Sequence, residues 1–321
     1  MSSPKVDIVI LNWNGIQDTR ECLLSLRTLT YPNYRIRLVD NGSSNNEAAI
    51  LEKEFPEADV IKLDTNTGFC IGNNVGMQKA LDEGTDFVML LNNDTLVSPG
   101  LLETLVENFG KLPHAGALSP VIMHYPEKEK VWFSIAKWET SWKRGEAQFR
   151  LSYNETYDEL KQKPPYETEF ACGCCMFTSA EVLQKAGLLD EKFFIFYDEA
   201  DWCARIRKMG YISYIVPSTK IYHKVGSGTP SLVATYLSVR NRLLFMSRHL
   251  TFGQKLRSWP CILKDYIWHR LNVWGMIPGK KQFLNRQISR AILRGWRDYY
   301  LRRFGKWNES TGRILFKKQD S

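Results

Sequence analysis

The chain has 321 residues, 44% of them hydrophobic, which allows one large domain or one domain with an appendage. It contains no run of 18 uncharged apolar residues, and residues 1–5 lack the apolar core of a signal peptide, so we expect a chain that begins and stays in the cytoplasm. Its seven cysteines are an odd number, which argues against a secreted disulfide framework and predicts free thiols.

The net charge of +8 is divided unevenly along the chain. Residues 240–321 carry 19 Lys and Arg against 4 Asp and Glu, a net charge of +15, and hold 5 of the 10 Trp, whereas residues 1–239 have a net charge of −7. An acidic N-terminal part repels nucleic acid, and a basic, Trp-containing tail suits an anionic surface. We therefore predict two domains, residues 1–240 and 241–321, and no nucleic-acid partner.

The first hundred residues alternate short β-rich runs with helical patterns. We predict strands at residues 6–11, 35–39, 60–63 and 87–91. Between them we predict helices near residues 18–29, 45–55 and 73–83. Asp18 with Glu21 resembles a capping box for the first helix, and Ser98 with Pro99 supplies a cap and a first-turn proline for a helix that ends near residue 111. This alternation predicts an α/β domain with a mainly parallel sheet.

The pattern weakens between residues 114 and 170. After it we predict a strand near residues 170–178, a helix at residues 179–186, an aromatic run at residues 193–197, a helix at residues 198–209 and a strand at residues 211–216. In the tail, helical spacing predicts an amphipathic helix from the apolar residues Ile262, Leu263, Tyr266, Ile267, Leu271 and Trp274. A second stretch places Arg286, Arg290, Arg294 and Arg297 on one stripe, which suits either a membrane interface or a helical hairpin packed on the first domain.

Asp94 follows an apolar run of five residues that reads as a buried strand of a parallel sheet. Open α/β sheets place their ligands beyond the C-terminal ends of such strands, and Mg²⁺ prefers carboxylate oxygens together with substrate phosphates. Asp94 is thus a candidate ligand for Mg²⁺ or Mn²⁺. The alternative is that Asn92, Asn93 and Asp94 only form a turn, because Asn and Asp favour turns.

Polar loops also follow the first two predicted strands. Asn12, Trp13 and Asn14 end the first strand, and Asp40 with Asn41 ends the second. An acid at the end of the second strand can accept hydrogen bonds from a ribose or a base, as in other nucleotide-binding sheets. Asp-Asn-Gly is also a strong turn signal, and the two interpretations stand side by side.

A glycine-rich stretch at residues 66–76 follows the third predicted strand and leads into a helix. Its glycine spacing is neither the dinucleotide fingerprint nor a Walker loop, which argues against a nicotinamide enzyme or a kinase. Backbone of this kind at a helix N-terminus can approach a phosphate or sugar, but the stretch by itself favours tight packing instead.

Three acids open the helix predicted at residues 198–209, and they have different explanations. Asp198 fits the N-cap, and Asp201 can pair with Arg205 one turn on. Glu199 has no such local role, and a carboxylate near a helix N-terminus is kept ionised by the helix dipole. Glu199 is the first candidate for a general base, unless all three acids only complement the dipole.

His223 lies just beyond the last predicted strand and is a candidate second metal ligand. A lone histidine is more often structural, so its weight depends on Asp94. Cys172, Cys174 and Cys175 lack the spacing of a zinc knuckle, and we predict small buried cysteines on a core strand instead.

Together these motifs resemble the family-2, inverting glycosyltransferases of the GT-A fold, in particular their bacterial rhamnosyltransferase-like branch. The likeness covers residues 5–245 and includes the loops at residues 9–15, 39–44, 66–76 and 90–95, the segment at residues 193–207 and the later histidine. The resemblance implies a Rossmann-like sheet with helices on both faces, followed here by a basic helical extension. It implies transfer of a sugar from a nucleotide-diphospho-sugar, UDP- or dTDP-linked, to a hydroxyl of a glycan or lipid-linked precursor in cell-envelope polysaccharide synthesis.

The resemblance also assigns roles to residues. Asp94 and His223 would hold the divalent cation, and Glu199, or else Asp198, would be the catalytic base. The donor would contact residues of the strand-end loops, namely Asn12, Trp13, Asn14, Asp40, Asn41, Asn66, Gly68, Phe69, Asn73, Asn92 and Asn93.

Two positions depart from the family pattern. Asn92 stands where the metal motif has its first acid, which weakens a ribose or metal contact there, and Glu199 stands where many relatives have Asp. The loops do not distinguish uridine from thymidine. A catalytically silent sugar-nucleotide or polyanion-binding protein of the same fold is the alternative function, and the tail predicts a peripheral location at the inner face of the cytoplasmic membrane.

Overall fold

The computed structural model describes residues 3–143, 146–224, 231–274, 276, 282–308 and 310–312. The chain divides into two compact units. Unit 1 comprises Met1–Lys137, Arg150–Asp190 and Asp198–Gly226, and unit 2 comprises Trp138–Phe149, Glu191–Tyr197 and Ser227–Ser321. The predicted domain boundary after residue 240 lies inside helix α8 (Leu232–His249), and two earlier segments of the chain also belong to unit 2.

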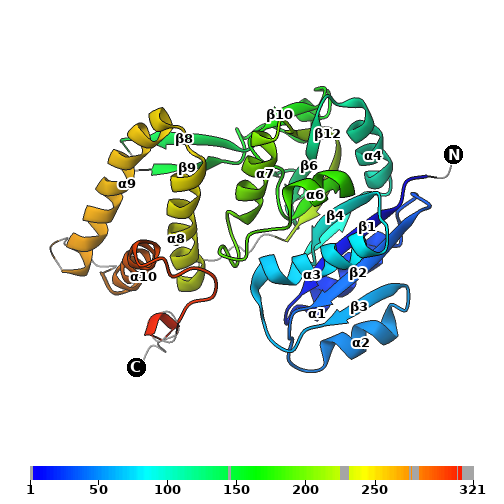
Figure 1. The fold of residues 1–321 in the computed structure, drawn as a ribbon, viewed down its shortest axis with the longest axis horizontal. Coiled ribbons are helices and arrows are strands. Elements are labelled where there is room, and N and C mark those ends of the chain that lie inside the picture. The colour runs from blue at the N-terminus through cyan, green and yellow to red at the C-terminus, as the bar shows by residue number, and fades with distance from the viewer. Residues whose placement is uncertain are drawn as a thin grey trace. The chain divides into compact units, whose positions relative to one another are not determined.

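A sheet of ten strands forms the centre of unit 1 in the described part of the chain (Figure 1). Eight strands follow one another across it in the order β10 (Tyr166–Thr168), β12 (Ile212–His223), β6 (Ala115–His124), β11 (Cys175–Ser179), β4 (Phe87–Asn92), β1 (Val6–Asn12), β2 (Tyr34–Asp40) and β3 (Ala58–Lys62). Two short strands join its side, β5 (Thr95–Val97) to β12 and β7 (Val131–Phe133) to β6. The strands β4, β1, β2 and β3 run parallel, as predicted, whereas β11 is antiparallel to both of its neighbours.

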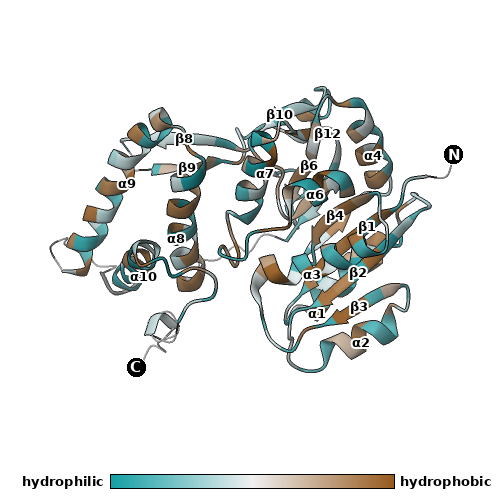
Figure 2. Cartoon of the chain, in the orientation of Figure 1, coloured by the Kyte–Doolittle hydropathy of each residue, from teal (hydrophilic) through white to brown (hydrophobic). Residues whose placement is uncertain are grey.

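The apolar runs of the sequence become the buried centre of this sheet. Val6, Ile8, Val9 and Ile10 of β1 are all fully buried, because β1 has a strand on each side and helix α3 packs on it. Strands β1 and β4 are accordingly among the most hydrophobic segments in Figure 2. A strand buried on both faces reads as a continuous apolar run, which is why the sequence located these two strands closely.

Seven helices belong to unit 1: α1 (Ile16–Leu26), α2 (Glu47–Glu54), α3 (Gly68–Asp82), α4 (Leu101–Lys111), α5 (Tyr157–Leu160), α6 (Ala180–Ala186) and α7 (Asp198–Lys208), counted over the described residues. Helix α3 packs on β1 and β2, and α4 packs on β6 and β12. Helix α3 begins at Gly68, earlier than predicted. Its glycines Gly72 and Gly76 allow this packing, since a Cβ atom on either would lie 2.4 or 2.5 Å from a side-chain carbon of Leu11 or Val9. The structure thus favours the packing interpretation of the glycine-rich stretch.

Both predicted helix caps are wrong. The N-cap of α1 is Gly15 and that of α4 is Gly100, and neither makes a side-chain capping bond. Asp18 and Glu21 instead form ion pairs of 2.8 Å with Lys224, which lies just beyond β12. Ser98 donates its hydroxyl to the carbonyl of Lys220 at 2.8 Å. In each case a partner from a distant part of the sequence replaces the local one.

Unit 2 contains the hairpin of β8 (Lys137–Ser141) and β9 (Glu146–Arg150) and three long helices, α8, α9 (Phe252–Val273) and α10 (Gln282–Tyr300). Helix α10 packs on both α8 and α9. The prediction of a C-terminal helical extension is confirmed. Among the described residues no helix combines the length and the apolar character needed to span a bilayer.

The seven cysteines are all free and buried. Cys175 begins the central strand β11, and Cys172 and Cys174 lie just before it with their sulfur atoms 3.5 Å apart. This agrees with the prediction of small buried cysteines on a core strand. Burial raises the pKa of the Cys175 thiol well above its usual range, so this thiol stays protonated at neutral pH.

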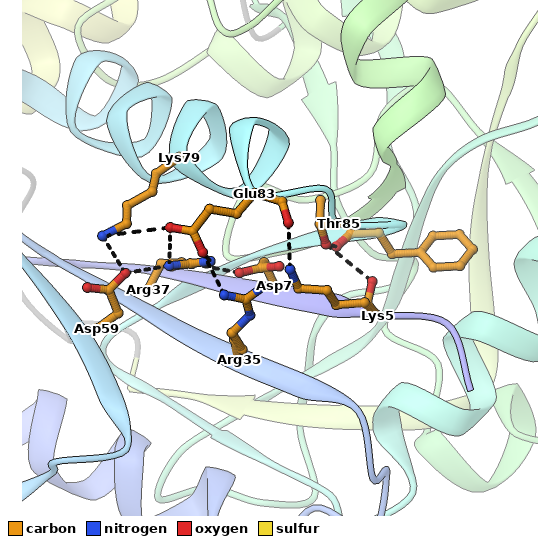
Figure 3. A network of polar contacts seen from close by, with 9 residues as sticks. Lys5, Asp7, Arg35, Arg37, Asp59, Lys79, Glu83 and Thr85 are labelled. Carbon is orange, nitrogen blue, oxygen red and sulfur yellow. Dashed lines mark hydrogen bonds and ion pairs between the residues drawn. The ribbon is translucent and has the colours of Figure 1, made fainter. Parts of the chain in front are cut away.

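A buried arginine holds one side of unit 1 together (Figure 3). The Arg37 side chain of β2 is 2% exposed, and its Nε donates to Oδ1 of the fully buried Asp7 on β1 at 2.6 Å. The same guanidinium donates to Glu83 after α3 at 2.7 Å and also pairs with Asp59 on β3. The network therefore links three neighbouring strands to the helix that covers them.

We predict that Arg37→Ala lowers the free energy of unfolding by about 3–5 kcal/mol, because it leaves the Asp7 carboxylate buried without a counter-charge. Lys62→Ala is the control: this lysine forms a 3.0 Å pair with Glu52 in which both side chains are about half exposed, and its loss should cost less than about 1 kcal/mol. Urea denaturation followed by circular dichroism measures both values. Equal losses in the two variants would show that the buried network has no special weight.

Candidate active site

The carboxyl ends of β4, β1 and β2 bring the predicted polar loops together. In the register of these strands Asn92 lies beside Leu11, and Asn12 lies beside Asp40. The ladder continues one step further, since the N–H of Asn41 donates to the carbonyl of Asn12 at 2.8 Å. The carboxyl-terminal edge of the sheet thus brings together side chains from loops that are well separated in the sequence.

Asn12 is the centre of a buried hydrogen-bond network at this edge. Its Nδ2 donates to Oδ2 of Asp40 at 2.9 Å, to Oε2 of Glu47 at 2.9 Å and to the Ser43 hydroxyl at 3.1 Å. Its Oδ1 accepts from the Thr19 hydroxyl at 2.8 Å. Because the amide of Asn12 is used in this way, its role is to hold the Asp40 carboxylate in place beside a second acid.

Glu47 is a further candidate site residue, which the sequence did not single out. It lies in the first turn of α2 and is 6% exposed, unlike most glutamates. The signal that could have found it is an acid at a helix start directly after a polar strand-end loop.

Trp13 and Asn14, which follow β1, are more exposed than Glu47. Trp13 is 54% exposed, and Asn14 accepts from the N–H of Ser44 at 2.8 Å.

Asn41 connects the loop after β2 to the start of α3. Its Oδ1 accepts from the N–H and the hydroxyl of Thr67, at 2.9 and 2.8 Å, and its Nδ2 donates to the carbonyl of Gly68 at 3.1 Å. Asn66 closes the turn by accepting from the N–H of Gly68 at 2.8 Å. Phe69 follows in the first turn of α3. The predicted donor residues Asn41, Asn66, Gly68 and Phe69 therefore lie in two hydrogen-bonded segments, the loop after β2 and the start of α3.

Asn73, Asn92 and Asn93 have more limited contacts. Asn73 donates to the carbonyl of Phe69 one turn back at 2.9 Å. Asn93 donates to the Thr19 hydroxyl at 2.9 Å and so joins the loop after β4 to the Asn12 network. The N–H of Asn92 donates to the carbonyl of Cys174 at 3.0 Å, which ties the end of β4 to the segment before β11.

Asp94 and His223 come together although they lie far apart in the sequence. Strand β5 pairs antiparallel with the end of β12, which places His223 opposite Thr95, and His223 Nε2 lies 3.1 Å from Asp94 Oδ1. The N–H of Lys224 also donates to the carbonyl of Asp94 at 2.9 Å. The imidazole is buried against the edge of the Trp132 ring, with ring centroids 4.8 Å apart.

This pair fits a divalent cation by its chemistry. A carboxylate oxygen and an imidazole nitrogen are both metal ligands, and the buried Asp94 Oδ1 faces His223 Nε2. The other ring nitrogen, His223 Nδ1, is buried without a hydrogen-bond partner among the described residues. Over the described residues no group of three or more His, Cys, Asp or Glu side chains could hold a metal ion. A cation at this pair would therefore need further oxygen ligands from a substrate or water, as Mg²⁺ sites usually have.

Glu199 lies in the first turn of α7, where its carboxylate accepts backbone N–H groups of Ala200 and Gly173. Burial raises the pKa of Glu199, and these hydrogen bonds only partly offset the effect. Gly173 precedes Cys174, which bonds to the end of β4, so the base candidate and the acid loop share one short segment of backbone. Gly173 itself was not predicted, because its contribution is an N–H group that almost any residue has.

The neighbouring acids of α7 differ in exposure. Asp198 is 2% exposed and Asp201 is 1% exposed, and Asp201 pairs with Arg205 at 3.1 Å as predicted. The Glu199 side chain is only partly buried. Of the two candidates for the base, Glu199 therefore has the more exposed side chain.

The chain thus has a mainly parallel sheet with an acid after its second strand, an Asp–His pair beyond its fourth and a carboxylate at a helix start. Open α/β sheets bind their ligands at such a strand-end edge. The comparison with known families specifies the class of protein. The model of glycosyl transferase family 2 matches residues 7–187, and the chain belongs to this family. Rhamnosyltransferases are among the relatives that it resembles in sequence.

Those relatives are distant in sequence, but the likeness spans most of each chain. The N-acetylglucosaminyl-diphospho-decaprenol L-rhamnosyltransferase of Mycobacterium tuberculosis is 23% identical over 70% of this chain and 77% of its own. The dTDP-rhamnosyl transferase RfbF of Shigella flexneri is 21% identical over 75% and 79%, respectively. The low-salt glycan biosynthesis hexosyltransferase Agl10 of Haloferax volcanii is 25% identical over 74% of each chain.

A solved structure supports the fold. The crystal structure of GalNAc-T7 with UDP, GalNAc and Mn²⁺ superposes with a TM-score of 0.57 over 88% of this chain, at 16% identity. The chain spans about half of that protein, 53% of its length. This structural likeness concerns the fold alone, and it agrees with the GT-A fold predicted from the sequence.

Proposed function

We propose that the protein is an inverting, metal-dependent glycosyltransferase that moves a sugar, with rhamnose as the first candidate, from a UDP- or dTDP-linked donor. The acceptor would be a hydroxyl of a glycan or lipid-linked glycan precursor in cell-envelope polysaccharide synthesis. The observation that carries this proposal is the meeting of Asp94 with His223 beside the polar loops of β1 and β2, in a chain of this family. Two of its relatives are rhamnosyltransferases by name.

The donor would lie along the carboxyl edge of β4, β1 and β2. Asp40, which accepts a hydrogen bond from Asn12, would accept further hydrogen bonds from the nucleoside. Asn41 holds the neighbouring start of α3, where Asn66, Gly68 and Phe69 lie. Trp13 and Asn14 would add contacts from the surface, and Asn73, Asn92 and Asn93 would complete the donor loops. The residue types leave uridine and thymidine equally suitable, and a thermal-shift panel of sugar nucleotides separates them.

Asp94 and His223 would hold Mg²⁺ or Mn²⁺. When bound, the cation would offset the negative charge that develops on the leaving diphosphate. Asn92 adds no charge at this position, so the protein contributes one carboxylate and one imidazole. The His223 side chain is 10% exposed and that of Asp94 is 30% exposed, so water screens the charge of Asp94 in part.

Glu199 would act as the general base. It would take the proton of the acceptor hydroxyl as the oxygen attacks the anomeric carbon from the face opposite the diphosphate. A single base and a direct displacement invert the anomeric centre and need no covalent intermediate. The raised pKa of Glu199 makes it a stronger base than an ordinary glutamate once it has lost its own proton.

The alternative, a catalytically silent sugar-nucleotide or polyanion-binding protein, keeps the same fold. Such a protein has no need for a base or for a metal pair. The retention of Asp94, Glu199 and His223 with the contacts described above favours the enzyme.

We predict that Asp94→Ala abolishes sugar transfer when Mg²⁺ or Mn²⁺ is supplied, while the protein stays folded, because the pair loses its only carboxylate. Nucleotide release from UDP- and dTDP-sugars, followed by chromatography, measures the effect. Glu129→Ala, at an exposed acid, is the control and should keep wild-type turnover. Turnover near that of the wild type in Asp94→Ala would reject the metal site.

We predict that kcat/KM falls on the acid side with an apparent pKa above the ordinary value for Glu, which is about 4.3. The sign follows from the chemistry: the base must be deprotonated, and burial favours the protonated form, so activity is lost at a higher pH than for an exposed glutamate. A pH–rate profile from mildly acidic to mildly alkaline pH tests this. An acid limb that persists unchanged in Glu199→Gln would assign it to another group.

The exposed apolar residues of α9 in unit 2 support the proposal of a membrane partner. Along α9 the exposed apolar residues Phe252, Leu256, Leu263 and Ile267 recur at helical spacing, while Cys261 and Ile262 are buried on the other side. Figure 2 accordingly shows hydrophobic and hydrophilic residues alternating along α9. A helix with one apolar face in solvent and one in the protein core suits a location in the plane of a lipid interface.

Arginines accompany this apolar stripe. A groove of about 620 Å³ between α9 and α10 is lined by Leu263, Tyr266, Arg270, Arg290, Leu293, Arg294, Trp296, Arg297 and Tyr300. Four guanidinium groups among aromatic and aliphatic side chains are complementary to anionic headgroups with apolar chains. These features support our proposal that the enzyme is a peripheral protein at the inner face of the cytoplasmic membrane, where a lipid-linked acceptor would be accessible.

We predict that Arg290→Glu with Arg294→Glu weakens binding to vesicles of phosphatidylcholine and phosphatidylglycerol by at least roughly 30-fold, at about 1 kcal/mol for each basic residue. Lys128→Glu with Lys130→Glu, exposed lysines of unit 1, carries the same charge change and should bind as the wild type does. Vesicle flotation measures both. Equal flotation of the two double variants would show that the groove has no part in membrane binding.

A further inference from the structure

The segment that leads into the catalytic helix has an unusual backbone. Phe194, Phe196 and Tyr197 all have positive φ angles, of 67°, 72° and 67°. This left-handed region is uncommon for residues other than glycine and is a true outlier for bulky side chains. Such a backbone persists only where the surrounding structure holds it. The next residue, Asp198, begins α7, and Glu199 follows directly.

Two buried residues of α8 hold this segment. The side chains of Arg240 and Asn241 are fully buried. Asn241 Nδ2 donates to the carbonyls of Phe193 at 2.7 Å, Ile195 at 2.8 Å and Phe196 at 3.0 Å. One amide thus holds three carbonyls of a single short segment: that of Phe196, which has a positive φ, and those of Phe193 and Ile195, which flank Phe194.

Arg240 sets the orientation of that amide. Its Nε donates to Asn241 Oδ1 at 3.0 Å, which directs the NH₂ group of Asn241 toward the carbonyls. Its Nη2 donates to the carbonyls of Phe193 and Lys192 at 3.2 and 3.3 Å, and its Nη1 donates to that of Gly305 at 2.6 Å. The guanidinium and the amide therefore act as one unit, which we call the α8 clamp.

Side chains of the segment anchor it as well. Phe194 packs in a cluster with Tyr236, Leu237 and Ala291, and its ring lies 5.6 Å from that of Trp307. Although it interrupts the part of the chain that forms unit 1, the segment belongs by its contacts to unit 2. Its backbone is consequently held by α8, and one peptide bond joins its last residue, Tyr197, to Asp198, the first residue of α7.

We propose that Arg240 and Asn241 are positioning residues for the catalytic base. The α8 clamp fixes the backbone from Phe193 to Phe196, this fixes where α7 begins, and the first turn of α7 presents the Glu199 carboxylate to the N–H of Gly173. The inference rests on the proposed role of Glu199. It also means that a catalytic domain ending at residue 240 lacks Asn241, which is part of its machinery.

The first test is independent of activity. Hydrogen exchange of the amides of residues 198–202, followed by mass spectrometry, should become at least tenfold faster in Asn241→Ala, whereas exchange in α4 should not change. The control is Ser247→Ala, also on α8, whose hydroxyl donates to a carbonyl of its own helix, at 2.8 Å. Wild-type exchange at residues 198–202 in a folded Asn241→Ala would overturn the proposal.

The second test is kinetic and uses the release of dTDP from dTDP-rhamnose and of UDP from UDP-sugars. Asn241→Ala should lower kcat at least 30-fold with the donor KM within about twofold, because the donor loops lie in unit 1, and it should lower the apparent pKa of the acid limb. Asn241→Asp should behave in the same way, since a carboxylate cannot donate to the three carbonyls. Adding Phe196→Gly should restore part of the loss, because glycine adopts the left-handed backbone without strain.

Glu199→Gln separates the two hypotheses. If it retains wild-type turnover, the base assignment fails, and faster exchange at residues 198–202 in Asn241→Ala would still support the clamp. If Glu199→Gln is inactive and Asn241→Ala keeps the wild-type kcat and acid limb, the positioning role is rejected. Should Asn241→Ala fail to fold, Arg240→Lys takes its place, since it keeps the charge and removes the Nε–H that orients Asn241; a kcat within twofold of the wild type would reject the role.

Discussion

The parallel pairing of β4, β1 and β2 is the constraint on which the rest of the structure depends. Parallel strands end at the same edge of a sheet, so their register places Asn92, Asn12 and Asp40 at one edge, where Asn12 also donates to Asp40. The apolar residues between these ends supply the stability, because they are buried on both faces. The chemistry of the site is thus a consequence of where three hydrophobic runs stop.

Three sets of hydrogen-bonded buried polar side chains then give this framework its detail. Arg37 with Asp7 joins the strands of unit 1, Asn12 holds two carboxylates at the carboxyl edge, and Asn241 holds the approach to α7. A buried polar group that lost its partners would bear the full cost of its desolvation. Such groups therefore favour one arrangement of the loops over others that would bury the same apolar area.

Local sequence rules located the strands but misjudged several polar residues. Asp18, Glu21 and Ser98 have the spacing of helix caps, yet they bond to Lys224 and Lys220 beyond or within β12. The spacing rules describe an isolated helix, where the nearest backbone N–H is the best donor available. In the folded chain an ammonium group or a strand carbonyl lies within reach instead, and no local pattern records it.

The sequence by itself determined the parallel sheet, the family, and the residues whose chemistry suits a donor, a cation and a base, because hydrophobic periodicity and residue type are properties of the chain alone. Only the tertiary structure decided that Asp94 meets His223, that Glu47 joins Asp40, and that residues 191–197 belong with α8 rather than with the sheet. These contacts join segments that are distant in the sequence, and they arise from strand pairing and from side chains that find partners in other elements. Neither strand pairing nor such long-range side-chain contacts can be predicted from the spacing of neighbouring residues.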